Sequence, residues 1–121
     1  MEATALPTSS GAFGVDWNSG NLILDYITQL VRLSREHPRV AVGVSPRGGL
    51  ALLRAARALA LIHGRDFVLP DDVKMLAPDV LAHRIILNIE DTLEGLRSEL
   101  VVDEMLSQVP APTGIGEAAP R

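Results

Sequence analysis

Hydrophobic side chains recur with helical spacing near the beginning of the chain. Leu22, Tyr26, Leu30 and Leu33 are spaced three or four positions apart. Ile23, Ile27 and Val31 each follow one of these residues and widen the apolar face. This period predicts an amphipathic helix over about residues 22–36. The helix is expected to end before Pro38, because a proline biases the preceding residue away from helical conformation.

A longer apolar segment covers residues 50–62 and predicts a second helix over about 46–63. Gly64 follows it and supplies the left-handed residue that commonly ends a helix. Because this helix is apolar on most of its surface, we expect it in the centre of a bundle. Its arginines, Arg47, Arg54 and Arg57, fall in a stripe about 80° wide at 3.6 residues per turn, so one face is basic.

A third helix is predicted to start at Pro70, where Asp71 and Asp72 would complement the helix dipole. Leu69 stands at its cap position and is a poor cap, because it has no side-chain acceptor for the free backbone N–H groups. Pro78 is expected to split this segment and leave a further turn of helix over 79–83.

The remaining elements are short. Residues 40–44 are an apolar connector of extended type, residues 67–68 a short extended piece, and residues 85–89 a short strand. Asp103 is predicted to cap a last helix that ends near Val109.

The composition indicates how these elements are organised into a domain. Hydrophobic residues make up 47% of the 121 residues and aromatic residues 3%, which favours an aliphatic, mainly α core. We expect one small bundle of four or five helices with a minor β pair over residues 21–109. Residues 1–20 are rich in Ser, Gly, Thr and Ala and predict a flexible lead-in, and residues 110–121 predict a disordered tail.

Charge and cysteine usage exclude several function classes. The net charge is −4 and Lys74 is the only lysine, which counts against a nucleic-acid binder. The absence of cysteine excludes disulfides, thiolate nucleophiles and cysteine-based zinc sites. No secretory pattern opens the chain, and the apolar segment 50–62 is too short for a bilayer, so we expect a cytoplasmic protein without a membrane partner.

The start of the second helix carries the main candidate site. Ser45 is a good N-cap, Pro46 suits the first helical position, and Gly48 and Gly49 leave the first turn without side-chain bulk. Arg47 lies where the helix dipole disfavours a cation by roughly 0.3–1 kcal/mol. A phosphate group bound beside it would remove that conflict. A solvated arginine at a helix start is the alternative.

Other catalytic patterns are weak. The phosphate-binding loop of nucleoside-triphosphate hydrolases is absent, so the acidic segment Leu100-Val101-Val102-Asp103-Glu104 has no partner for a magnesium site. His37, His63 and His83 do not have the three- or four-residue spacing of helical metal ligands, and no metal site is predicted. Asp71-Asp72 and His83-Arg84 are explained as residues that complement helix ends.

Taken together, the segments over about 24–109 resemble the C-terminal lid of a MoxR-family AAA+ ATPase. The matching blocks are Tyr26-Ile27 with Leu30-Val31, Ser34-Arg35 with His37-Pro38, Gly43-x-Ser45-Pro46-Arg47, Leu52-Leu53 with Ala55-Ala56, Gly64-Arg65-Asp66-x-Val68, Pro70-x-Asp72-Val73 and Val80-Leu81-x-His83-Arg84. Gly48-Gly49 departs from the more usual Ala-Ser, and Leu69 and Ser34 stand where threonine is common.

This resemblance implies that Arg47 is the sensor 2 arginine, which contacts the γ-phosphate of ATP, with Ser45, Pro46 and Gly48 around it. ATP and magnesium would then belong to the parent ATPase, whose core domain and neighbouring ring subunits are the expected partners, together with von Willebrand factor A domain proteins. The fragment alone would be inactive. The resemblance gives no firm role to Arg35, Arg54, Arg57 or Arg84.

Two other functions stay open from the sequence. One is a free-standing helical adaptor that binds a protein partner or nucleic acid through Arg47, Arg54 and Arg57. The other is the lid of a magnesium-chelatase-type subunit, which shares part of the pattern. Within the MoxR resemblance, the parent is expected to be chaperone-like, acting in protein or metal-cofactor assembly.

Overall fold

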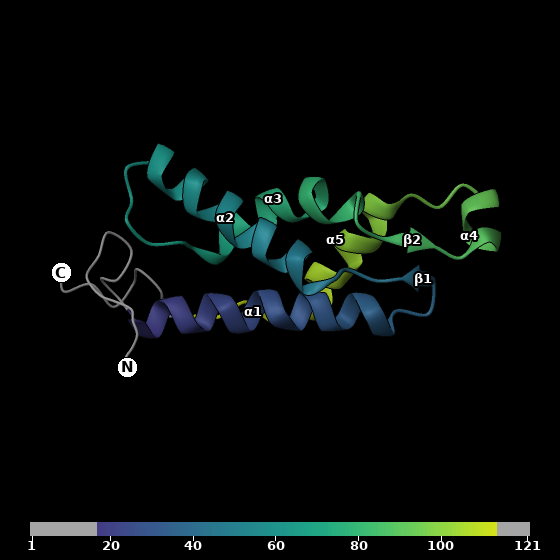
Figure 1. Ribbon diagram of the computed structural model, residues 1–121, viewed down its shortest axis with the longest axis horizontal. Helices are drawn as coiled ribbons and strands as arrows, with labels where there is room; N and C mark the ends of the chain where they lie inside the picture. The colour runs from purple at the N-terminus through teal and green to yellow at the C-terminus, as the bar shows by residue number, and fades with distance from the viewer. Residues whose placement is uncertain (1–16, 114–121) are drawn as a thin grey trace.

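The computed structural model describes residues 17–113, with side chains from residue 22 onward, and is mainly helical. In chain order its elements are α1 (Trp17–Glu36), β1 (Val40–Val42), α2 (Pro46–Ile62), α3 (Pro70–Ala82), β2 (Ile86–Leu87), α4 (Ile89–Leu93) and α5 (Ser98–Gln108). Figure 1 shows α1 along one side of the molecule and α2 and α3 along the other, with the β pair and α4 at one end. The expected small helical bundle with a minor β pair is confirmed.

The core lies where the apolar faces of four helices meet. Helix α1 contributes the face predicted from its spacing, and α2, α3 and α5 each contribute residues one turn apart. Its fully buried side chains include Tyr26, Leu30, Leu52, Leu81, Val102 and Met105. The hydroxyl of Tyr26 is buried and finds no hydrogen-bond partner among the described residues. Burial, together with the negative charge of Asp71, raises the pKa of this phenol.

Helix α2 packs on both α1 and α3, as expected for the most apolar helix. It buries Leu52, Ala56 and Ala60 against them. Other positions of α2 are open, because Leu50, Leu61 and Ile62 are 46%, 56% and 77% exposed. The helix ends as predicted, with Gly64 at a φ of +79°.

Helix α3 is continuous through Pro78, so the predicted split there is wrong. A proline inside a helix loses one backbone hydrogen bond and costs about 3 kcal/mol. Packing compensates for this loss, because the neighbouring residues Ala77 and Leu81 are fully buried between α2 and α5. Tertiary contacts therefore decide the conformation of this segment.

The C-terminal third also departs from expectation. Helix α5 begins at Ser98, so Asp103 lies inside it and is not its cap. The predicted strand 85–89 is reduced to Ile86–Leu87, which pairs antiparallel with β1 (Val40 opposite Leu87), and Ile89 already belongs to α4. Residues 67–68 form a bend and a loop position, not an extended pair.

The predicted domain boundaries can be compared with the structure only in part. Helix α1 begins at Trp17, so residues 17–20 of the expected lead-in belong to a helix. The rest of the lead-in, 1–16, and residues 114–121 of the expected tail lie outside the described residues. Within the described part, none of the helices has both the length and the apolar character required to cross a membrane.

Candidate functional site

The end of α1 holds the backbone that leads into α2. The hydroxyl of Ser34 accepts a hydrogen bond from the N–H of Val44 (2.9 Å) and donates one to the carbonyl of Val31 (2.7 Å). The next residue, Arg35, donates from Nε to the carbonyl of Val44 (3.2 Å). Two consecutive residues of α1 thus bind both polar groups of Val44, which lies three residues before Arg47.

Gly43 permits this close approach. A Cβ added at Gly43 would lie 2.8 Å from both the Cα and the backbone N of Arg35. Both atoms belong to the α1 backbone, so no flexible side chain there can move aside. The glycine of the Gly43-x-Ser45-Pro46-Arg47 block therefore brings the chain against α1.

Replacing Gly43 with alanine is expected to destabilise the domain by about 1–3 kcal/mol, because the backbone after β1 must separate from that of α1. Ala41→Ser is the matched control, since Ala41 is exposed on β1 two residues before Gly43 and should change stability by less than about 0.5 kcal/mol. Urea denaturation of both variants measures the difference. Equal midpoints would show that the approach at Gly43 is not needed.

The first turn of α2 has the predicted residues but not all of the predicted bonds. Ser45 occupies the N-cap with an extended backbone (φ −81°, ψ 165°), and Pro46 opens the helix. The Ser45 hydroxyl makes no capping bond, contrary to expectation. Its backbone carbonyl instead accepts from the N–H groups of Gly48 (2.9 Å) and Gly49 (3.3 Å).

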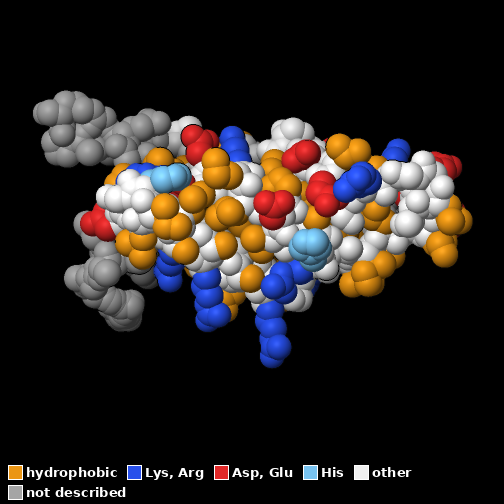
Figure 2. Space-filling view, turned by 90° about the horizontal axis from the view of Figure 1, so that it is seen from above, with side chains coloured by type: hydrophobic (Ala, Val, Ile, Leu, Met, Phe, Trp, Pro, Cys, Tyr) orange, Lys and Arg blue, Asp and Glu red, His pale blue; other side chains and the backbone are white. Residues whose placement is uncertain are grey.

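Arg47 is exposed in this turn, which contains no acidic residue. None of the ion pairs or side-chain hydrogen bonds found within residues 17–113 involves it. Its guanidinium is therefore open to a ligand from outside the domain. Figure 2 shows that Lys and Arg side chains project along one long edge of the molecule.

Gly48 and Gly49 are buried packing positions and not a loosened helix start. A Cβ on Gly49 would lie 2.9 Å from the Cγ2 of Val31 on α1. A Cβ on Gly48 would collide with the side chain of Val44 and lie 2.9 Å from the Cδ of Arg84. The two glycines let three neighbouring segments pack against the first turn of α2.

A groove of about 410 Å³ runs between α1 and α2 beside this turn. Its apolar lining includes Leu24 and Leu50, and Pro46 lies at its edge near Arg47. Arg32 and Arg35 also line it, which makes part of its rim basic. Arg47 directly follows the lining residue Pro46 but does not itself line the groove.

Two other titratable residues considered from the sequence, His37 and Glu104, contact each other. The ring of His37 is buried, with Nδ1 accepting from the N–H of Arg39 (3.1 Å) and Nε2 3.1 Å from a carboxylate oxygen of Glu104. Glu104 lies on α5, so the acidic segment 100–104 is helical. Within the described residues, no three His, Asp or Glu side chains are placed to hold a metal ion.

Asp72 forms a buried ion pair that the sequence did not reveal. Both guanidinium NH₂ groups of Arg65 donate to its carboxylate, at 2.7 and 2.8 Å, and the N–H of Leu69 donates to it at 2.8 Å. Burial alone would raise the pKa of Asp72, but these hydrogen bonds and the charges of Arg65 and His63 outweigh it and lower the pKa below its ordinary value. Asp72 thus caps α3, and the weak cap Leu69 is compensated.

The four other arginines considered from the sequence fall into two groups. Arg54 and Arg57 are exposed on α2, as the predicted stripe requires. Arg35 and Arg84 lie on opposite sides of the α2 start, Arg35 beside Val44 and Arg84 beside Gly48. Sequence spacing could not reveal the second group, because Arg35 and Arg84 come from two segments that are far apart in the sequence. The unusual pair of glycines after Arg47 was the one available signal.

Comparison with known proteins now defines the class of this domain. Residues 32–105 match the family model described as AAA lid domain. The chain belongs to this family, as a lid of the MoxR type.

Two relatives show the extent of the match. The chain is 49% identical over 90 residues to the uncharacterized protein YeaC of Bacillus subtilis, covering 74% of this chain and 28% of that protein. It is 36% identical over 99 residues to the chaperone MoxR1 of Mycobacterium tuberculosis, covering 74% of this chain and 26% of MoxR1. The chain therefore spans about a quarter of the length of these curated relatives.

A solved structure agrees with the fold. The crystal structure of a provisionally named ATPase from Cytophaga hutchinsonii superposes with a TM-score of 0.72 at 33% identity, covering 79% of this chain and 34% of that one. Magnesium-chelatase subunit ChlI-1 of Arabidopsis thaliana matches a shorter part, 52% of this chain at 40% identity. The MoxR relatives thus account for more of the sequence than the chelatase does.

Proposed function

We propose that this domain is the lid of a MoxR-like AAA+ ATPase, that it closes over ATP held in a separate core domain, and that Arg47 is its sensor 2 arginine. The observation that carries the proposal is the state of Arg47: exposed, in a first helical turn without an acid, and without an ion-pair partner within residues 17–113. An arginine disfavoured by the helix dipole gains most when an anion approaches it.

The residues around Arg47 fit a phosphate group from another module. Ser45 and Pro46 are exposed beside Arg47, while Gly48 is buried and lets the first turn pack closely on Val44 and Arg84. Arg47 would bind and orient the terminal phosphates through its fork of N–H donors, and the Ser34 and Arg35 bonds to Val44 would hold the turn in place. ATP with magnesium would supply the phosphoanhydride bond to be hydrolysed, and the core would hold both.

The wider roles follow the relatives and belong to the same proposal. A core domain and neighbouring subunits of a ring are the partners that an AAA lid requires. MoxR1 is named a chaperone, and we extend a chaperone-like role to the ATPase that carries this lid. Proteins with a von Willebrand factor A domain are its proposed partners. The free-standing adaptor and the chelatase lid receive no specific support from the site.

Titration of the 121-residue chain with ATP and magnesium is expected to show millimolar binding and no turnover, because most phosphate contacts would come from the core. Calorimetry and a phosphate-release assay measure the two quantities. Micromolar affinity, or hydrolysis by this chain alone, would contradict a lid function and favour an independent enzyme.

A further inference from the structure

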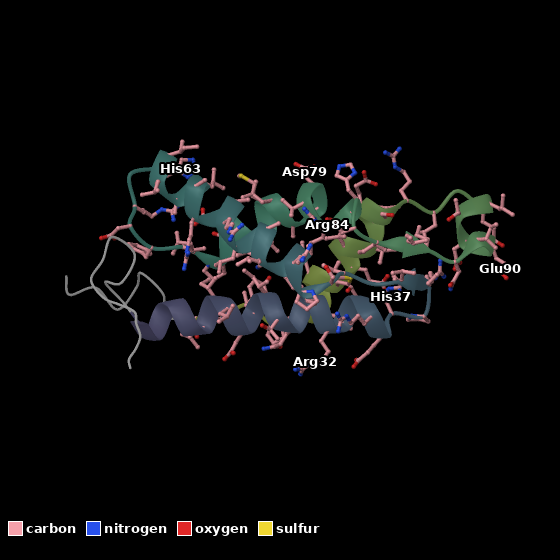
Figure 3. All side chains as sticks on the ribbon, in the orientation of Figure 1. Arg32, His37, His63, Asp79, Arg84 and Glu90 are labelled. Carbon is pink, nitrogen blue, oxygen red and sulfur yellow. The ribbon has the colours of Figure 1, made fainter. Side chains whose placement is uncertain are left out.

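Arg84 reaches the start of α2 from a different part of the chain. It lies in the turn after α3, where its N–H donates to the carbonyl of Leu81 at 2.9 Å. Its Cδ lies 2.9 Å from the place where a Cβ on Gly48 would stand. Figure 3 shows Arg84 in the middle of the molecule, where the end of α3 approaches the start of α2.

The alkyl stem of Arg84 therefore packs directly on the residue after Arg47. Gly48 makes this contact possible, because any larger residue would meet both Arg84 and Val44. A long side chain that packs along its stem loses rotamer freedom and presents its charged end in a restricted region. The packing on Gly48 places the stem of Arg84 beside the residue that directly follows Arg47.

The arginines near the start of α2 are not paired with acidic side chains among the described residues. The chain has 15 Asp and Glu against 11 Lys and Arg, yet none of the ion pairs found among residues 17–113 includes Arg35, Arg47 or Arg84. The Nε of Arg35 donates a hydrogen bond to the carbonyl of Val44, which helps to position the first turn of α2. Arg47 and Arg84 make no side-chain hydrogen bond to any described residue. Arginine side chains that form no ion pair within the described residues favour an anion from outside the domain.

We infer that Arg84 is a second phosphate-binding residue, which together with Arg47 contacts the polyphosphate of a nucleoside triphosphate from two sides of Gly48. This inference rests on the proposed function, because it takes the anion to be the one that Arg47 senses. A triphosphate carries several negative charges, and two guanidinium groups from separate segments would fix its orientation better than one. Each group keeps all of its donors for that anion.

The test uses the isotope-labelled 121-residue chain and sodium tripolyphosphate as the probe, with NMR shifts of the Gly48 and Gly49 amides as the readout. Arg84→Gln and Arg47→Gln are compared with Arg97→Gln. Arg97 is the matched control, because it is 74% exposed, carries the same charge, and lies near Glu99 at the start of α5. All variants are checked for an unchanged melting temperature.

The expected result is that Arg84→Gln and Arg47→Gln each weaken tripolyphosphate binding roughly three- to fivefold, while Arg97→Gln leaves it unchanged at 0.15 M salt. If Arg84→Gln behaves like the control and Arg47→Gln does not, the inference on Arg84 is overturned and the proposed role of Arg47 stands. If all three variants behave alike, or the chain shows no shift, both proposals lose their basis.

Discussion

Replacing Arg47 with alanine in the complete ATPase that carries this lid is expected to lower kcat for ATP hydrolysis at least about tenfold. A hydrogen bond to a charged group contributes about 1.5–3 kcal/mol, and 1.4 kcal/mol corresponds to one factor of ten in rate. A sensor that acts on the γ-phosphate should reduce kcat more than it raises KM for ATP. Steady-state hydrolysis by both proteins measures the two constants.

Arg54→Ala provides the matched control, because Arg54 is exposed on the same helix about two turns further along. It should change kcat less than twofold. Stability is the second control, since Arg47 is exposed and unpaired within residues 17–113, and its removal should alter the free energy of unfolding by less than about 0.5 kcal/mol. An unchanged kcat in the Arg47 variant would remove this residue from the mechanism.

The largest loss of stability is expected from Asp72→Ala. Asp72 is 4% exposed, and its removal leaves the Arg65 guanidinium without its carboxylate and the Leu69 N–H without its acceptor. Removing one partner of a buried ion pair costs about 3–5 kcal/mol. Because the side chain of Arg65 is 21% exposed and water can reach it, we expect a value near the lower limit. Chemical denaturation measures the free energy of unfolding.

The double variant Arg65→Met with Asp72→Leu tests the cause of this loss. Replacing both charges with apolar groups of similar volume is often close to neutral. It should therefore recover much of the stability lost in Asp72→Ala. A double variant as unstable as the single one would show that the loss comes from the α3 cap at Leu69 and not from the unpaired arginine.

The same pair predicts how stability depends on pH. The pKa of Asp72 is lower in the folded domain than its ordinary value of 3.8, so the folded state favours the ionised form. Its contribution is complete above that value and is lost as the pH falls through the lower folded pKa. Wild-type protein should therefore lose more stability between pH 5 and strongly acidic pH than an Asp72→Asn variant.

The sequence predicted the elements whose signals are local. The apolar period gave α1 and α2, and Gly64 marked the end of α2. Pro78 and Asp103 gave wrong boundaries, because both predictions relied on single-residue preferences. Burial of Ala77 and Leu81 outweighs the preference at Pro78, and such packing depends on contacts between distant segments.

In the candidate site, too, local features were predictable from the sequence and contacts between distant residues were not. Arg47, Pro46 and Gly48 stand next to each other in the sequence, so their common location was predictable. Arg65 and Asp72 are seven residues apart and join across a loop, which no period or motif spacing indicates. The position of Arg84 beside Gly48 could be found only once α2 and α3 were placed side by side.

The hold of α1 on Val44 has a mechanical consequence. Ser34 and Arg35 bind both polar groups of Val44, and Arg47 lies only three residues further along the chain. A displacement of α1 should therefore displace Arg47 as well. Under the proposed function, pressure on α1 would reposition Arg47 relative to the phosphate that it is proposed to bind, while the packing of the bundle stays the same.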